Sequence, residues 1–401
     1  MAVYHNIVDA GWLSLLRAGA TDVWDFTRDQ YLRAGSFGAS GVSITRASTG
    51  YAETEAGVLV PFASGALRRT DKGVLVEGAR TNLLLRSQEF DNASWAKNAN
   101  GTASAPAITA DFGLAPDNTM TADRVQFNLG GGTTSGDRSL LTQSVTITNG
   151  VAHSVSVWMR SLSGSVNMGI GADAIAGHQP VTVTTSWQRF TFTATSTGTS
   201  ATVFIHLRGG QTPTNSNTAD ILIWGAQLEA ASFASSYIPT GGSTVTRAAD
   251  EVSASLSGIA YPLSIFAEWQ RVGGTDASSF YRVFSLNTFG NETTVYHRNT
   301  NNFIRLFQLN SGATQADLTL GTGDIGGIQK AAGSFGTDNI RGSLNGAAVA
   351  SDLSATMPSS PTVATFGINA NNQEQLDGYL RRAAIFSTAL TDAQLQAITS
   401  T

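Results

Sequence analysis

Aromatic and basic side chains alternate with aliphatic ones in three short segments, 154–160, 203–208 and 221–224. Successive side chains of a β-strand point to opposite faces, so the Val, Ile and Met side chains predict the face turned toward a core. The rings then lie on the opposite face, where they could stack on sugars, and guanidinium groups beside them could bind hydroxyls or acidic sugars. The candidate carbohydrate-binding residues are Trp158, Trp224, Phe204, His206, Arg160 and Arg208.

A second interpretation of this aromatic face is that a loop or another chain covers it. A cluster of exposed rings lowers solubility, so such a face is either covered or used for binding. In the last third of the sequence, Tyr281, Tyr296, His297 and Arg298 are weaker candidates, and burial in the fold is the preferred explanation for them.

The usual catalytic motifs do not occur in the sequence. Glycoside hydrolysis needs two carboxylates beside one bond, and the nearest acidic run, Glu89–Asp91, has Ala93 and Ser94 where a third acid would stand. Neither a Gly-x-Ser-x-Gly turn nor a phosphate-binding loop is present, and the five histidines lack metal-ligand spacing. Structural calcium has no support either, because no Asp/Asn cluster has loop-ligand spacing. The sequence therefore predicts no enzyme and no cofactor, although distant acids could still converge in space.

The composition excludes several classes of protein. The 401 residues, 41% hydrophobic and 13% charged, predict two or three globular domains rather than a disordered chain. The net charge of -5 gives no basic surface, so we expect no nucleic-acid partner. The sequence has no cysteine, no apolar run of transmembrane length and no signal peptide, so we expect folding in a reducing cytoplasm and no membrane insertion.

The stretch Gly225–Asp250 separates two modules. Before it, Ile221–Trp224 is β-branched and aromatic and predicts the final strand of a module. Pro239 has no backbone donor and Gly241-Gly242 follows it, so no strand can continue there; new strands are expected near Leu263. We expect three parts: an N-terminal attachment region with lead-in strands (1–79), a middle module (80–250) and a last module (251–401).

The two ends of the chain predict short helices. Residues 6–17 carry apolar side chains at helical spacing, and this stripe either docks onto another protein or covers the end of the neighbouring module. Near the C-terminus, Thr391 followed by Gln394 predicts a capping box and a final helix. Between them, Asn345-Gly346 predicts a tight hairpin, because both residues tolerate positive φ.

Two sets of motifs resemble known families. GVLVEGARTNLLLRSQEFDNASW (73–95), APDNTMTADRV (115–125), TTSWQRFTFTAT (184–195) and the closing WGAQLE, SYIPT and TRAAD (224–250) occur in the order of a carbohydrate-binding-like jelly-roll module found in tailed-phage virion proteins. SLNGAAV, TFGIN and LDGYLRRAAIFSTALTDAQLQAIT resemble the second half of a concanavalin A-like (laminin-G-like) sandwich, and the last 25 residues are the most specific part of the match.

These resemblances imply an all-β protein of two tandem antiparallel β-sandwiches, a jelly roll and then a concanavalin A-like module, after the N-terminal region. They imply a bacteriophage virion component, assembled in the host cytoplasm, that joins other virion proteins through its N-terminal region. As a fibre, spike or head decoration it would recognise host surface polysaccharide without catalysis, and as a homo-oligomer, with a trimer favoured. The alternatives are a structural decoration that binds no glycan and, third, a polysaccharide depolymerase.

Overall fold

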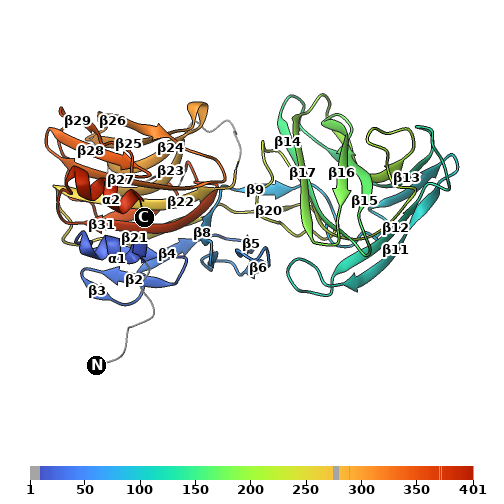
Figure 1. Cartoon of the computed structure of the whole chain (residues 1–401), viewed down its shortest axis with the longest axis horizontal. Helices are drawn as coiled ribbons and strands as arrows, with labels where there is room; N and C mark the ends of the chain where they lie inside the picture. Colours follow the sequence, from blue (N-terminus) through green and yellow to red (C-terminus); the bar gives the residue numbers. More distant parts are fainter. Residues whose placement is uncertain (1–9, 274–279, 289, 370, 372, 401) are drawn as a thin grey trace. The chain divides into compact units, whose positions relative to one another are not determined.

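The computed structural model describes residues 10–273, 280–288, 290–369, 371 and 373–400. The paired strands among them are antiparallel, and the chain divides into two compact units. Unit 1 comprises the described residues of 1–49, 62–79 and 248–401, and unit 2 comprises 50–61 and 80–247 (Figure 1). Each unit has two main sheets packed around its own core, so the predicted all-β fold of two antiparallel sandwiches is confirmed. None of the described helices is long and apolar enough to cross a membrane.

Unit 1 is built from two large sheets. The larger one has ten strands, which in spatial order are β29 (Ala350–Asp352), β28 (Asn339–Leu344), β27 (Ile328–Gly336), β22 (Leu263–Arg271), β31 (Gly378–Phe386), β1 (Asp22–Asp25), β2 (Gln30–Arg33) and β3 (Ser36–Phe37), joined by β7 (Arg69–Thr70) and β8 (Gly73–Val76). The seven-stranded sheet runs β26 (Ala313–Thr322), β25 (Phe303–Asn310), β24 (Asn291–Arg298), β23 (Phe280–Thr288), β30 (Val363–Phe366), β21 (Glu251–Ser255) and β4 (Val42–Thr45), and the 3₁₀ turn η1 (Asn299–Asn301) follows β24. The faces of the two sheets that meet carry one continuous apolar core.

Two helices cover the other face of the ten-stranded sheet (Figure 1). They are α1 (Ala10–Arg17) and α2 (Asp392–Ser400). Trp12 of α1 and Leu395 of α2 are buried against apolar side chains of the sheet. The stripe predicted in residues 6–17 therefore covers its own unit in the part the structure describes, while residues 6–9 lie outside the described range. The predicted capping box is confirmed, because Thr391 Oγ1 accepts from the backbone N–H of Gln394 at 3.3 Å while Gln394 Oε1 accepts from that of Thr391 at 2.9 Å.

The N-terminal region is not a separate part of the chain, and this corrects the expected division at 1–79, 80–250 and 251–401. One edge of β31 pairs with β22, and the other edge pairs with β1 and β8. Strand β4 likewise pairs with β21. An open strand edge exposes unpaired N–H and C=O groups, so these early strands complete the sandwich that the last third of the chain begins. Such a long-range pairing leaves no local sequence signal.

A buried ion-pair network also ties the early segments to unit 1. The carboxylate of Asp250 accepts from Nη1 of Arg46 at 2.9 Å and from Nη2 of Arg68. Arg68 in turn donates to Oε2 of Glu77 at 2.6 Å, and all four side chains are almost fully buried. Buried charges are tolerated only when they are paired, so removing one member leaves an uncompensated charge in the interior.

Unit 2 is a sandwich of two five-stranded sheets. The first, which we call sheet E, runs β10 (Ala96–Asn100), β13 (Arg138–Thr146), β18 (Ser200–Arg208), β15 (Val166–Ala172) and β16 (Ala176–Val183). The second, sheet F, runs β11 (Ser104–Gly113), β12 (Ala122–Asn128), β19 (Thr218–Glu229), β14 (Ala152–Ser161) and β17 (Gln188–Thr195). Two short ribbons complete it: β20 (Val245–Arg247) with β9 (Arg80–Asn82), and β5 (Gly50–Glu53) with β6 (Leu59–Phe62).

The alternation read from the sequence of unit 2 is confirmed. The Val, Ile and Met side chains of segments 154–160, 203–208 and 221–224 all lie in the core between sheets E and F. The strand containing Ile221–Trp224 does not end there, however, but runs on to Glu229. Gly225 has φ +66 beside a bulge in the pairing of β14 with β19, so the chain absorbs the irregularity and keeps pairing. The strands of unit 1 resume at β21, which begins before the expected Leu263.

Candidate functional site

Trp158 and Trp224 lie in contact on the outer face of sheet F. They are register partners on β14 and β19, with ring centroids 5.6 Å apart. Tyr237 packs over both rings, 5.7 Å from Trp158 and 4.4 Å from Trp224, and the ring of Tyr51 lies 6.5 Å from Trp224. The two tryptophans are 7% and 0% exposed. They form a small second core with other side chains of the protein, so the aromatic face is covered at these two residues, as the second interpretation predicts.

Basic side chains add to this cover. Arg189 lies 4.2 Å from the ring centroid of Trp158, and the predicted site residue Arg160 lies 5.7 Å from that of Trp187. Cation–π contacts of this kind stabilise the arrangement of the rings. Arg160 is therefore placed beside a ring of its own unit rather than beside the paired tryptophans.

Phe204 and His206 lie on β18 in sheet E, so they do not join the tryptophans. Their ring centroids are 5.0 Å apart. Nε2 of His206 is 2.8 Å from Nδ1 of His178, a residue that no sequence pattern indicated. Gly169 of β15 lies between these imidazoles, and a Cβ there would be 2.2 Å from Nε2 of His206 and 2.3 Å from Cε1 of His178. Only glycine lets the two rings meet across the strand.

The histidine pair is neutral at pH 7. Burial, with the positive charges of His178, Arg208 and Arg138, lowers the pKa of His206 to about 3. Burial and Arg208 also lower the pKa of His178. The predicted site residue Arg208 donates a hydrogen bond to the carbonyl oxygen of Ser135 at 3.0 Å. Within the described part of the chain, no three His, Asp or Glu side chains gather in a way that could hold a metal ion.

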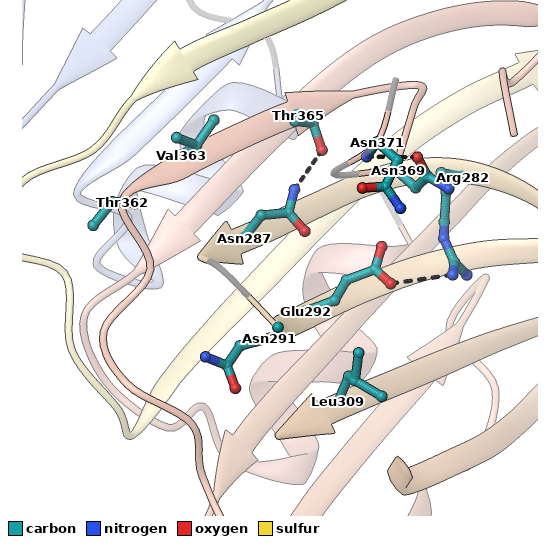
Figure 2. A pocket seen from close by; sticks show the side chains of 11 residues that line it. Arg282, Asn287, Asn291, Glu292, Leu309, Thr362, Val363, Thr365, Asn369 and Asn371 are labelled. Atoms are coloured by element: carbon teal, nitrogen blue, oxygen red, sulfur yellow. Dashed lines mark hydrogen bonds and ion pairs between the residues drawn. The ribbon is translucent and has the colours of Figure 1, made fainter. Parts of the chain in front are cut away.

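A pocket lined by several polar and charged side chains lies in unit 1, on the outer face of the seven-stranded sheet (Figure 2). Its volume is about 610 Å³, and its lining comes from β23, β24, β25 and β30 and from the segment after β30. The side chains that matter most for its chemistry are Arg282, Asn287 and Glu292, which are 9%, 4% and 7% exposed. A ligand pocket of this size with a few convergent polar groups is the usual form of a small-molecule or sugar site.

Asn287 and Glu292 form the centre of the pocket. They are register partners on β23 and β24, so their side chains leave the same face of the sheet. Nδ2 of Asn287 donates to Oγ1 of Thr365 at 2.7 Å, and Oε2 of Glu292 accepts from Nη2 of Arg282 at 3.1 Å. Neither Oδ1 of Asn287 nor Oε1 of Glu292 has a hydrogen-bond partner in the described protein, although both atoms are buried. Figure 2 shows the Glu292 carboxylate between the Asn287 amide and the Arg282 guanidinium.

Arg282 reaches this face because of a β-bulge. Residues five positions apart in a regular strand point to opposite faces, so Arg282 and Asn287 would normally be separated. The pairing of β23 with β24 shifts register between Arg282 and Phe284, and this brings Arg282 opposite Tyr296 on the outer face. The rings of Tyr296 and Phe307 lie 5.2 and 5.5 Å from its guanidinium carbon.

The electrostatics of the pocket are dominated by one cation and two carboxylates. Nε of Arg282 is 3.0 Å from Oε2 of Glu374, so the guanidinium lies between Glu374 and Glu292. Burial raises the pKa of Glu292; the charge of Arg282 opposes this rise, and the charge of Glu374 adds to it. The nearby Ser285 hydroxyl opposes the rise least, and its hydrogen bond is made with Oγ1 of Thr294 at 2.6 Å rather than with Oε1 of Glu292. The Glu292 carboxyl group is a strong hydrogen-bond acceptor when ionised.

None of the motifs in the sequence indicated the residues at the centre of this pocket. Of the weaker candidates in the sequence, Tyr296 lies beside Arg282, whereas Tyr281 and His297 are buried register partners. A local signal for Asn287 and Glu292 did exist, because they lie equally far from the middle of a short connection that contains Gly290. Hairpin pairing across such a connection places them opposite each other.

No family model matches the sequence. Among curated proteins, too, there is no match. Solved structures match parts of the chain at low similarity. The fourth domain of an extracellular arabinanase from Geobacillus stearothermophilus, solved with arabinotriose, is 13% identical and matches 38% of this chain and 73% of its own, with a TM-score of 0.30. The galectin LEC-6 of Caenorhabditis elegans is 14% identical over 34% of this chain and 89% of its own, with a TM-score of 0.26.

A third structure matches more of the chain. The tandem CBM22 modules of Paenibacillus barcinonensis Xyn10C are 12% identical and match 79% of this chain and 100% of their own, with a TM-score of 0.27. Similarity at this level does not extend to what those proteins bind. The site must be judged from the chemistry of its own residues.

Proposed function

We propose that this chain binds a glycan without catalysis, in the pocket formed by Arg282, Asn287 and Glu292. The observation that carries the proposal is the pair of buried acceptors, Oδ1 of Asn287 and Oε1 of Glu292, which face an open pocket and have no donor in the described protein. A buried acceptor left unpaired costs free energy, and a ligand that donates to it recovers that cost. Neighbouring hydroxyls on a sugar ring supply such donors in a fixed geometry.

The remainder of the pocket suits the apolar face of a sugar. Leu309 and Val363 line it, and they project from β25 and β30 on either side of the polar centre. Sugar-binding sites combine apolar surface for C–H groups with a few fixed polar groups. Because the polar groups sit on paired strands rather than on loops, they are positioned before a ligand arrives.

The charge arrangement supports binding rather than hydrolysis. A glycosidase needs one carboxyl group that holds a proton and a second that is ionised. Here Glu292 and Glu374 both lie within ion-pair distance of one guanidinium, at 3.1 and 3.0 Å, so the two carboxyl groups of the pocket are held together in one ion-pair network with Arg282. The depolymerase alternative is tested by whether glycan fragments are released.

The finer proposal is that the glycan belongs to a host cell surface and that the chain is part of a phage virion, in which it forms a homo-oligomer, with a trimer favoured. Its support is the resemblance of the jelly-roll and concanavalin A-like motifs to tailed-phage virion modules. Attachment through the N-terminal region is supported by two apolar side chains there, Leu13 and Phe37, which are 38% and 64% exposed. The alternative, a structural decoration without a ligand, predicts a pocket that binds no glycan.

A glycan array with the full chain tests the proposal. Wild-type protein should bind at least one glycan, and Asn287→Ala and Glu292→Gln should each weaken that binding about tenfold or more, the effect of losing a hydrogen bond that involves a charged or buried group. The matched control is Asn98→Ala, because Asn98 also donates to a threonine hydroxyl, that of Thr142 at 3.3 Å, but lies exposed on β10 of unit 2. Product release is measured in parallel by a reducing-sugar assay.

Three outcomes would contradict the proposal. Binding to no glycan on the array would favour the structural decoration. Binding that survives both pocket substitutions in folded protein would place the site elsewhere. Release of fragments by wild-type protein would establish the depolymerase.

A further inference from the structure

The orientation of the Asn287 amide determines what the pocket can accept. The single hydroxyl proton of Thr365 is donated to the carbonyl oxygen of Ile368 at 3.0 Å. The Thr365 oxygen can therefore only accept from Asn287, which it does at 2.7 Å, and this assigns Nδ2 to that contact. The group of Asn287 that remains for a ligand is Oδ1, which can accept but cannot donate.

The Glu292 carboxylate imposes the same requirement. Oε2 is engaged by Arg282, and Oε1 is the atom left facing the pocket. Asn287 and Glu292 are opposite each other on neighbouring strands, so their Cβ atoms are about 4.5–5.5 Å apart. One sugar ring can therefore meet both acceptors with two neighbouring donors.

The charges of the site oppose an anionic ligand. Arg282 is the cation of this group, and its charge is shared between Glu292 and Glu374, which leaves the three side chains with one net negative charge. The other residues that line the pocket in the described part of the chain carry no charge. A carboxylate or sulfate placed against Oε1 of Glu292 would find no free cation and would meet a like charge.

We propose that this pocket selects glycans that donate hydrogen bonds and carry no negative charge, namely neutral hexoses and amino sugars, over uronic, sialic or sulfated sugars. The inference rests on the proposed glycan binding and specifies its substrate class. An ammonium group satisfies the same requirement as a hydroxyl, because it donates three hydrogen bonds and complements the net charge. Selectivity thus has two sources: the negative charge at Glu292 repels acidic sugars, and the two acceptor atoms bind the donors of neutral ones.

The test uses neutral and acidic oligosaccharides of the same linkage, β-1,4-glucan with β-1,4-glucuronan and β-1,4-mannan with β-1,4-polymannuronate, together with glucosamine oligomers. Calorimetry on the full chain should show that at least one neutral or amino member binds about tenfold or more tightly than its uronic counterpart. Glu292→Gln removes the charge at the pocket centre and should reduce that ratio to about threefold or less. Asn98→Ala should leave it unchanged.

A second variant, Glu374→Gln, keeps the inference testable if Glu292→Gln does not fold. Glu374 is 25% exposed, so Glu374→Gln removes negative charge without burying an unpaired group. It should also reduce the ratio of the affinity for the neutral glycan to that for its uronic counterpart. A uronic sugar that binds as tightly as its neutral partner, with binding lost in Asn287→Ala, would overturn the inference while leaving the proposed function intact. Binding of none of these glycans would overturn both.

Discussion

Replacing Trp24 by alanine tests whether the N-terminal strands are part of the core of unit 1. Trp24 lies on β1, is 0% exposed and packs edge-on against Phe366 with ring centroids 5.0 Å apart. Its Nε1 donates to the carbonyl oxygen of Ser40 at 2.9 Å, and its backbone pairs with Ala383 of β31. The side chain therefore contacts both sheets of the sandwich, and its loss leaves a large cavity between them.

The expected cost follows from the buried area. A buried aromatic side chain removes about 150–250 Å² from water, which at about 25 cal/mol per Å² corresponds to about 4–6 kcal/mol as an upper estimate. Measured aromatic-to-alanine substitutions in cores cost about 3–5 kcal/mol. For a unit of this size, each kcal/mol lowers the melting temperature by about 2–4 °C, so Trp24→Ala should lower that of unit 1 by about 6–20 °C.

Scanning calorimetry combined with hydrogen exchange provides the assay. The backbone amides of β31 should lose protection in Trp24→Ala, whereas those of β14 in unit 2 should not. Phe37→Ala is the control, because Phe37 is an aromatic residue of the same region that is 64% exposed. If Trp24→Ala behaves like Phe37→Ala and β31 keeps its protection, the N-terminal strands do not belong to this core. Deletion of residues 1–57 removes β1 and β4, which pair with β31 and β21, and should by the same reasoning unfold unit 1.

Three further predictions concern buried polar and aromatic groups. Asp250→Asn should destabilise unit 1 by about 3–5 kcal/mol in urea unfolding, because the buried guanidinium of Arg46 loses the carboxylate with which it pairs and that of Arg68 keeps only Glu77, whereas Glu89→Gln, in an exposed ion pair, should change stability by less than about 1 kcal/mol. The pKa of His206 falls from 6.5 to about 3 on folding, so between these pH values the unfolded chain binds a proton that the folded chain does not. The free energy of unfolding should therefore be highest above pH 6.5 and should decrease as the pH falls toward 3, by about 2 kcal/mol at pH 5. An NMR titration in which the His206 ring protonates near pH 6 would refute that. Trp224→Ala should lower the stability of unit 2 by about 3–5 kcal/mol and leave glycan affinity per folded molecule unchanged; weaker binding by folded protein would instead place a site at Trp224.

Local patterns predicted the features that depend on neighbours in the chain. Alternation placed Val155 and Ile205 in a core and Trp158 on the other face, because strand geometry fixes which way each side chain points. The capping box at Thr391 was predicted for a similar reason, since its hydrogen bonds join residues three apart. These features depend only on residues that are close together in the sequence.

The same alternation could not say what covers a face. Phe204 and Trp224 both point away from the core of unit 2, yet they lie on different sheets, β18 in one and β19 in the other. The predicted single group of six residues therefore does not form. Tyr51, which covers Trp224, comes from a segment far away in the sequence.

By itself, then, the sequence determined the fold class, the faces of the strands and the two helical ends of the chain. Only the tertiary structure decided that β1, β4 and β8 complete the sandwich of unit 1, because the partner of a strand edge is set by long-range pairing. It also decided the pocket. Asn287 and Glu292 meet across a hairpin, but Arg282 joins them only because a bulge in β23 reverses the side to which it points.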